Sequence, residues 1–345
     1  MLYRPSTLWT WILLVSTFIE VVVLITLEAV IYSSIRNNVT PIAWDISAYR
    51  CIPTFFVLVT LWVVYQLLLV YDTLVQQSTI QLIGLGIYSA VLSVYNGIQY
   101  GQLRDIVEVL IANAAARPGS LQEMWPLLQG MMISIIAITA SFTLWILFSA
   151  WKLHEEFAWV TLRTVDADKQ MRRRYLYSQA SKPFSFAVLL LSLLKFDGFF
   201  FLGFLLQLAI VPYSKSSPTF VAAVALMPIS CCLLFITAWV VRKEHRVGTV
   251  VISVFHLALM GFFIYMLTAL SLPPSYLNYL QAKRTLSFFG IINIILALGT
   301  VVITGLCFRN FGQGLRPYVS GGAKAGLLGE TVGSESYSRV PHEAI

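Results

Sequence analysis

The strongest constraint on this fold is a series of long apolar runs, each able to cross a lipid bilayer. A hydrocarbon core of about 30 Å needs about 20 apolar residues in a helix, which rises about 1.5 Å per residue. Lipid cannot hydrogen-bond to an exposed backbone, so each run should be a helix. The sequence therefore predicts an all-α, polytopic transmembrane helix bundle. Its eight expected spans are Leu8–Ser33, Ile52–Tyr71, Thr79–Tyr100, Trp125–Trp151, Phe184–Pro212, Thr219–Val241, Val247–Leu270 and Thr285–Phe308.

Composition supports the membrane class. Hydrophobic residues make up 58% of the 345 residues and charged residues only 11%, whereas a soluble domain carries about a quarter charged residues. The boundary between the second and third runs is the shortest, because only Asp72–Ser78 separates them. The third run is also interrupted by Tyr95, Asn96 and Gln99. We therefore expect eight spans and keep seven as the alternative.

Basic residues are distributed unevenly between the two sides that eight spans would create. Of the 23 Lys and Arg residues, 15 fall on the side that carries both termini, 7 fall on the other side, and Lys195 lies inside a run. Cytosolic loops carry an excess of Lys and Arg, so both termini are expected to be cytosolic. The net charge of +7 then reflects this bias and contact with anionic lipid head groups in the bilayer. No nucleic-acid partner is expected.

The chain is expected to consist of a membrane part and a tail. Residues 1–308 form the predicted bundle, which includes a cytosolic helical loop at 152–183. Residues 309–345 are rich in Gly and Ser and are predicted to be a disordered cytosolic tail. In the loop, Arg172, Arg173 and Arg174 are expected to hold anionic head groups, at about 1 kcal/mol per basic residue near the surface. Docking of a cytosolic partner or a coat is the alternative role.

Two short motifs lie outside the predicted spans. Asn38-Val39-Thr40 is a sequon for N-glycosylation in the first loop, on the predicted lumenal side. Its closeness to the membrane argues against modification. In the tail, Tyr337-Ser338-Arg339-Val340 has the tyrosine-x-x-hydrophobic pattern that clathrin adaptors bind as an extended peptide. Asn38 is therefore a candidate glycosylation site, and Tyr337 with Val340 a candidate sorting motif.

Two charged residues interrupt the fifth run near its centre. Lys195 lies about 16 Å along the helix from Phe184, close to the bilayer midplane, and Asp197 lies about 20 Å along it. A charge at this depth costs at least about 2.5–3.5 kcal/mol, so each group needs a partner or a function. Two residues correspond to a turn of about 200°, so Lys195 and Asp197 cannot pair with each other.

Depth suggests a separate partner for each charge. Glu20 lies about 18 Å into the first helix and matches Lys195. His256 in the seventh run, or Asn293 in the eighth, is the expected partner of Asp197. These groups form either a structural polar network that fixes helix register or the lining of a site for a ligand, ion or proton.

Residue clusters typical of catalysis or metal binding do not occur in the sequence. No His/Glu metal-binding spacing, glycine-rich phosphate loop or Ser/His/Asp set is present. The chain is therefore not expected to be an enzyme, and no cofactor or metal ion is expected. The four histidines are scattered, at His154, His245, His256 and His342.

Three segments between Trp151 and Gln207 resemble an uncharacterised family of fungal Golgi multi-pass membrane proteins. One departure is Gly198, where the resemblance would favour an aromatic residue. The resemblance implies residence in the Golgi apparatus membrane, seven or eight spans and a fungal source, and it implies no activity. The segments are WKLHEEFAW at 151–159, ADKQMRR at 167–173 and LKFDGFFFLGF at 194–204.

These observations favour a polytopic Golgi membrane protein that acts in trafficking or organises other membrane proteins. Its expected partners are the lipid bilayer, other membrane proteins and coat adaptors. The alternative is a small-molecule or proton-coupled transporter, or a receptor-like bundle, with a polar site at the level of Lys195 and Asp197. A dry, fully paired network would favour the first hypothesis, and a cavity that contacts both residues would favour the second.

Overall fold

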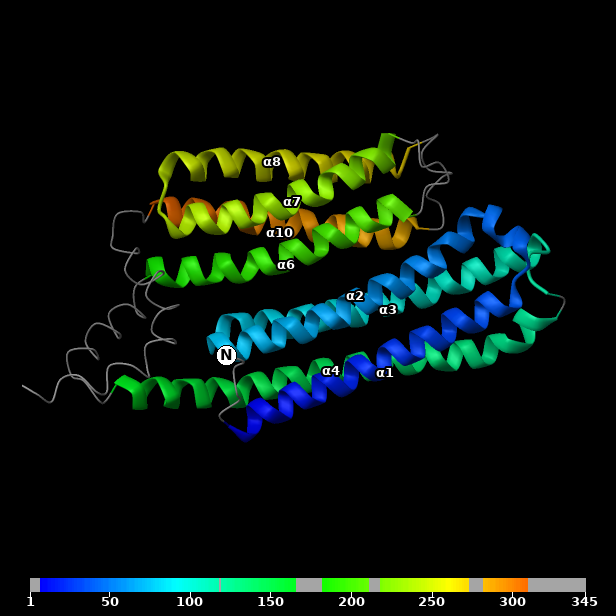
Figure 1. Cartoon of the computed structure of the whole chain (residues 1–345), viewed down its shortest axis with the longest axis horizontal. Helices are drawn as coiled ribbons and strands as arrows, with labels where there is room; N and C mark the ends of the chain where they lie inside the picture. Colours follow the sequence, from blue (N-terminus) through cyan, green and yellow to red (C-terminus); the bar gives the residue numbers. More distant parts are fainter. Residues whose placement is uncertain (1–6, 118, 166–181, 211–217, 273–281, 310–345) are drawn as a thin grey trace, which may run out of the picture.

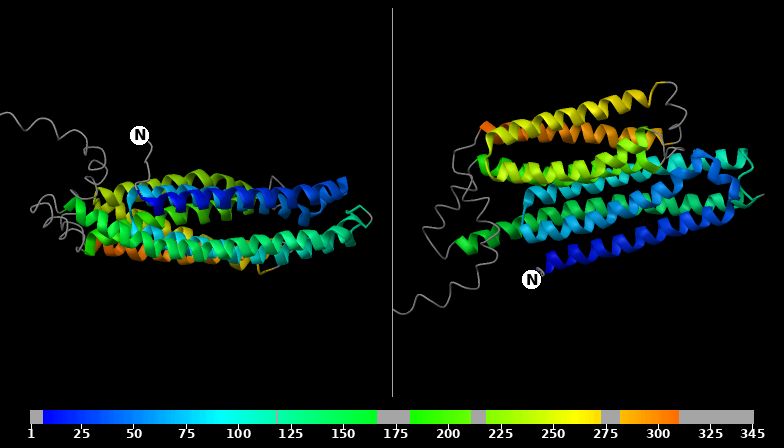
Figure 2. Two further views of the ribbon diagram at one scale, coloured as in Figure 1. Left: turned by 90° about the horizontal axis from the view of Figure 1, so that it is seen from below. Right: turned by 45° about the horizontal axis from the view of Figure 1, so that its top comes forward.

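The computed structural model describes residues 7–117, 119–165, 182–210, 218–272 and 282–309. In these residues, eight helices are long and apolar enough to cross a membrane, and they lie along one common axis (Figures 1 and 2). The prediction of an all-α polytopic bundle is confirmed. The helices are α1 (Leu8–Asn38), α2 (Ser47–Gln76), α3 (Thr79–Ala112), α4 (Ser120–Val165), α6 (Lys182–Ile210), α7 (Pro218–Arg242), α8 (Arg246–Ala269) and α10 (Lys283–Arg309).

The break between α2 and α3 decides between seven and eight spans. Gln77 adopts a left-handed conformation with φ of 48°, which ends α2. Ser78 then caps α3, because its side chain accepts a hydrogen bond from the Gln81 backbone N–H at 3.4 Å. The described part of the chain therefore has eight candidate spans. Asp72, which the sequence placed in a loop, lies inside α2.

The helices form two halves. The N-terminal half contains α1 to α4, with α1 packed on α2 and α4, and α3 on α2 and α4. The C-terminal half contains α6, α7, α8 and α10, with α6 packed on α7 and α10, and α8 on α7 and α10. Contacts of α2 and α3 with α6, and of α3 with α10, join the halves. We call this boundary the seam.

Aromatic side chains fill the centre of the seam. Trp62 of α2 is fully buried, and its ring centroid lies 4.9–5.7 Å from those of five neighbouring rings. Such pairs add about 0.5–1.5 kcal/mol each beyond area burial. The rings around Trp62 therefore hold the halves together and belong to Tyr88, Tyr95, Phe199, Phe200 and Phe289.

The bundle has two ends. At the N-terminal face, α1, α3, α6 and α8 begin and α2, α4, α7 and α10 end. At the opposite face, the short 3₁₀ helix η1 (Pro41–Asp45) follows α1. There the Thr40 backbone N–H donates to the Ala115 carbonyl at 2.8 Å, and the Arg117 N–H donates to the Asn38 carbonyl at 3.0 Å. These bonds tie the α1–α2 connection to the α3–α4 connection.

Candidate functional site

Lys195 binds a partner that differs from the prediction. Its ammonium group pairs with the Asp72 carboxylate and donates to Gln81 Oε1 at 3.1 Å. Gln81 also donates from Nε2 to Asp72 Oδ2 at 2.5 Å, so the three side chains join α6, α2 and α3. The predicted pair of Lys195 with Glu20 is wrong.

The direction of the lysine side chain explains this correction. Side chains on a helix tilt toward its N-terminus, and α6 begins at the N-terminal face. The ammonium of Lys195 therefore lies nearer to that face than its own Cα. Asp72 lies four residues before the end of α2, about 6 Å from the same face. The pair is not fully desolvated, because the two side chains are 29% and 35% exposed.

Glu20 instead joins α1 to α2. Its Oε2 accepts a hydrogen bond from Gln66 Nε2 at 2.9 Å, and both side chains are buried. About two helical turns further along α1, Glu28 Oε1 accepts a hydrogen bond from Gln99 Nε2 at 2.9 Å and so joins α1 to α3. Sequence reasoning missed both glutamines, although a glutamine inside an apolar run is itself a signal for an interhelical hydrogen bond.

Smaller polar side chains join α4 to its neighbours. Ser89 and Thr143 hydroxyls lie 2.9 Å apart, and Asn96 Nδ2 donates to Thr139 Oγ1 at 3.4 Å, so both contacts connect α3 and α4. The four-residue spacing of Thr139 and Thr143 places them on one helix face. That spacing was the available sequence signal for this contact.

Asp197 faces the C-terminal half. Its Oδ2 accepts a hydrogen bond from Thr300 Oγ1 of α10 at 2.5 Å. Its Oδ1 has no hydrogen-bond partner in the described part of the chain. Thr300 was missed because threonine is common inside apolar helices and carries no charge that would mark it.

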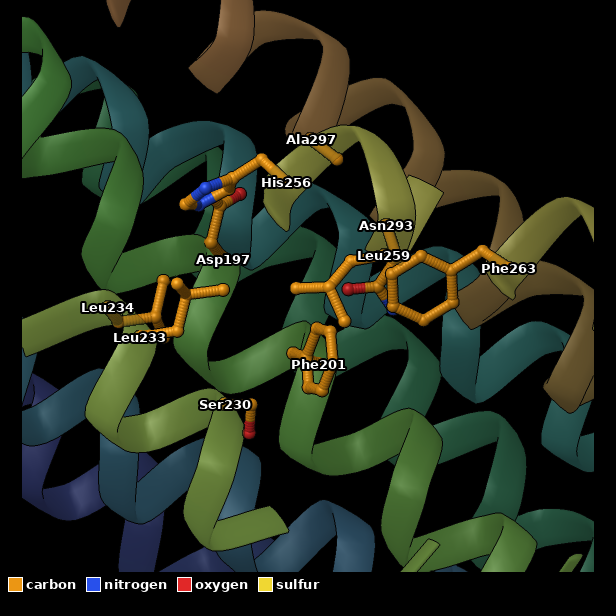
Figure 3. Close-up of a pocket in the computed structure, with 10 residues that line it drawn as sticks. All are labelled: Asp197, Phe201, Ser230, Leu233, Leu234, His256, Leu259, Phe263, Asn293 and Ala297. Carbon is orange, nitrogen blue, oxygen red and sulfur yellow. The ribbon is translucent and has the colours of Figure 1, made fainter. Parts of the chain in front are cut away.

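His256 and Asn293, the expected partners of Asp197, share a cavity with it but make no hydrogen bond to it in the described part of the chain. All three line one cavity of about 20 Å³, together with Ser230 (Figure 3). His256 Nδ1 lies 3.0 Å from the Ile252 carbonyl, while its Nε2 has no partner within the described ranges. The Asn293 amide donates to the backbone carbonyl of Phe200 at 3.0 Å.

The volume of this cavity is close to that needed by one water molecule. A single water molecule needs about 10–15 Å³ and two to four polar partners. Asp197 and His256 both line the cavity, and each has one buried polar atom, Oδ1 and Nε2, without a hydrogen-bond partner in the described residues. A carboxyl group and an imidazole are the residue types that carry protons inside membranes. In the described residues, no group of three or more His, Cys, Asp or Glu side chains gathers in a way that could hold a metal ion.

Of three other predicted sites, one lies in the described residues and two lie outside them. Asn38 is the last residue of α1, and its Nδ2 donates to the Ser34 carbonyl at 2.8 Å. Its glycosylation stays a prediction. The basic run Arg172–Arg174 and the Tyr337/Val340 motif lie outside the described residues.

Comparison with known proteins found one informative relative. The chain is 21% identical over 282 residues to the UPF0658 Golgi apparatus membrane protein of Schizosaccharomyces pombe, and the match covers 77% of this chain and 76% of the relative. No family model matches the sequence. No solved structure matches it either. The resemblance to uncharacterised fungal Golgi multi-pass membrane proteins is therefore confirmed as a distant similarity.

Proposed function

We propose that this protein is a Golgi-resident, non-enzymatic membrane protein that organises other membrane proteins or takes part in their trafficking. The observation that carries the proposal is the pairing of buried and half-buried polar groups between helices. Glu20 with Gln66, Glu28 with Gln99, and Lys195 with Asp72 each join two different helices. The Golgi location is carried over from the name of the distant relative.

Such pairing supports a structural role for most of the network. A polar group inside the membrane gains more from a fixed partner than from lipid, so each pair favours one rotation and register of its helices. Lys195 does not line the cavity that Asp197 borders. A transport pathway through both groups would need a cavity that contacts both.

An organising role also needs a surface that partners can reach. α7 and α8 have the lowest buried shares of the eight spans, 17% and 22%. Large side chains such as Phe235 and Val254 are 78% and 61% exposed on them. We propose that these two helices face membrane-protein partners. The proposal also keeps both termini in the cytosol, where Arg172–Arg174 would meet anionic lipid and Tyr337 with Val340 would meet a coat adaptor.

Affinity purification in a mild detergent tests this function. The tagged wild-type protein should retain a reproducible set of membrane proteins that an unrelated Golgi membrane protein of similar abundance does not retain. The single variant Lys195→Met leaves Asp72 without its counter-ion and should lower the thermal midpoint. The double variant Lys195→Met/Asp72→Leu removes both charges and should recover the midpoint together with the partner set.

The double variant separates folding from function. If it is as stable as the wild type and reaches the Golgi but loses the partners, Lys195 and Asp72 do more than fix the structure. If the wild type retains no specific partner, while Asp197→Asn or His256→Gln removes a cellular activity, the organising role is wrong.

A proton-coupled transporter is the second candidate, and the Asp197–His256 cavity favours it. Purified wild-type protein in vesicles with a pH-sensitive dye would then carry protons down an imposed gradient. Asp197→Asn and His256→Gln would abolish the flux, while Ser253→Ala, outside the cavity lining on α8, would keep it. Absence of flux with the wild type would exclude this candidate.

A further inference from the structure

A large apolar groove lies on the seam between the halves, away from the Asp197 cavity. Its volume is about 540 Å³, and it is lined by one face each of α3, α6 and α10. Pockets that bind small molecules have volumes of about 300–1,000 Å³. Because three helices from both halves form this seam groove, it exists only in the folded bundle.

The groove opens sideways into the space that lipid would occupy. Ile83 and Ile87 of α3 are 54% and 61% exposed, and Ile295 of α10 is 63% exposed. Tyr88 and Phe200 form part of its inner wall, and both rings belong to the aromatic cluster around Trp62. The occupant must therefore be apolar and must enter from the bilayer.

The length of the groove matches one leaflet. Along α3 the lining runs from Ile80 to Val91, and along α6 from Leu189 to Phe200, which is about 16 Å on each helix. Half of a hydrocarbon core is about 15 Å thick. Ile80 is the second residue of α3, so the groove starts at the N-terminal face and ends near the midplane. A transmembrane partner helix would need about twice this length.

A small polar side chain interrupts the apolar wall. Ser192 lines the groove and is only 5% exposed. A buried hydroxyl favours a hydrogen-bond partner, and an occupant of the groove can supply one to Ser192. Ser192 lies three residues past Leu189, about 5 Å below the start of the groove. With Ile80 of α3 taken as the edge of the hydrocarbon, this is the depth at which the ester or amide carbonyl of a lipid joins its chain.

We propose that the seam groove binds one acyl chain of a membrane lipid from the leaflet at the N-terminal face, with the acyl carbonyl next to the Ser192 hydroxyl. Ester-linked phospholipids and amide-linked sphingolipids share this chemistry. The proposal does not depend on the organising or transport function, since it concerns a different surface.

Photo-crosslinking of the full-length protein tests the proposal. The protein is placed in bilayer discs that contain phosphatidylcholine with a diazirine in one acyl chain, and labelled peptides are identified by mass spectrometry. Labels should concentrate on the lining of α3, α6 and α10. Labels spread evenly over all lipid-facing helices would overturn the proposal.

A matched pair of substitutions tests the shape of the groove. Leu193→Trp puts a larger side chain into the groove. Leu191→Trp makes the same change on the same helix at a residue that does not line the groove. Leu193→Trp should lower groove labelling about tenfold, which corresponds to about 1.4 kcal/mol. Unchanged labelling in a folded Leu193→Trp protein would contradict the proposal. If this variant does not fold, the label map of the wild type still decides.

Lipid chemistry tests the carbonyl contact. An ester-linked and an amide-linked photolipid should both label the groove, and an ether-linked analogue without the carbonyl should label it several-fold less. Ser192→Ala should remove this difference. Equal labelling by ester and ether lipids in the wild type would overturn the contact with Ser192, and preferential labelling by a photo-sterol would overturn the acyl chain as occupant.

Discussion

At the scale of single residues, the buried carboxyl groups are held by donors on other helices. Glu20 has Gln66, Glu28 has Gln99, and Asp197 has Thr300. Water cannot replace such a donor inside the bundle. Removing it therefore lowers the free energy of unfolding by more than the hydrogen bond contributes net, because the remaining carboxyl group stays buried without a partner.

Gln66→Leu should destabilise the protein by about 1–3 kcal/mol, because it leaves the buried Glu20 carboxyl without its donor. Thermal unfolding in detergent measures the effect. Gln122→Leu, at an exposed position, should be nearly neutral. The double variant Glu20→Leu/Gln66→Leu should recover most of the loss, because both polar groups are then absent. A single variant as stable as the wild type would show that this bond does not hold α1 on α2.

Thr300→Val should also cost about 1–3 kcal/mol, because it keeps the side-chain shape and removes the only donor found for Asp197 among the described residues. The matched control is Thr26→Val, whose hydroxyl is exposed and bonds within its own helix, with an expected change within about 0.5 kcal/mol. Equal midpoints for both variants would argue against the Thr300 contact.

At the scale of elements, close approach of helices depends on particular glycines. Gly203 of α6 faces α10, and a Cβ added there would lie 2.5 Å from the Phe289 ring. Gly261 of α8 has no such neighbour within 4 Å. Both glycines lie in helices, so intrinsic helix propensity alone would favour alanine at either position.

Gly203→Ala should therefore destabilise the protein by about 1–3 kcal/mol, because α6 and Phe289 must move apart. Gly261→Ala should be neutral or stabilising by up to about 1 kcal/mol. Denaturation midpoints of the two variants in one detergent measure the difference. A stabilising Gly203→Ala would mean that α6 and α10 pack less closely than described.

At the scale of the whole molecule, the two halves are joined at three levels. Lys195 and Asp72 pair toward the N-terminal face, the Trp62 cluster fills the centre, and Arg284 of α10 pairs with Asp105 of α3 at 3.0 Å toward the opposite face. The last pair is exposed, at 63% and 47%, so its contribution should be at most about 1 kcal/mol.

Trp62→Ala should cost about 3–5 kcal/mol, because it removes the largest buried side chain of the seam. Arg284→Ala should shift the unfolding midpoint far less. Trp151→Ala is the matched control, because this tryptophan is 59% exposed. If Arg284→Ala were the more damaging of the two seam variants, the ion pair rather than the aromatic cluster would hold the halves together.

Much of the bundle could be predicted from the sequence. The expected run Thr285–Phe308 and the observed α10 (Lys283–Arg309) differ by only a few residues, because apolar length and lipid chemistry together determine a span. Helix bounds were less accurate where helices continue past the hydrocarbon. The expected apolar run ended at Tyr71, so Asp72 looked like part of a loop. In the structure α2 continues to Gln76 and therefore includes Asp72.

Part of the candidate site could also be predicted. His256 or Asn293 was expected to be the partner of Asp197; both line one cavity with it, but its hydrogen bond comes from Thr300. The partner of Lys195 was not predicted, because matching by Cα depth ignores a long side chain that tilts toward the N-terminal face. The Thr300 donor gave no charge signal, so its role depended on the rotation of α10 against α6.

The sequence by itself determined the class of this protein and its spans, because only helices satisfy the backbone in lipid and each apolar run has the length of one bilayer crossing. The tertiary structure alone decided which polar groups meet and that a groove one leaflet deep lies on the seam. Those features depend on helix rotation and side-chain direction, which hydropathy and depth leave undetermined.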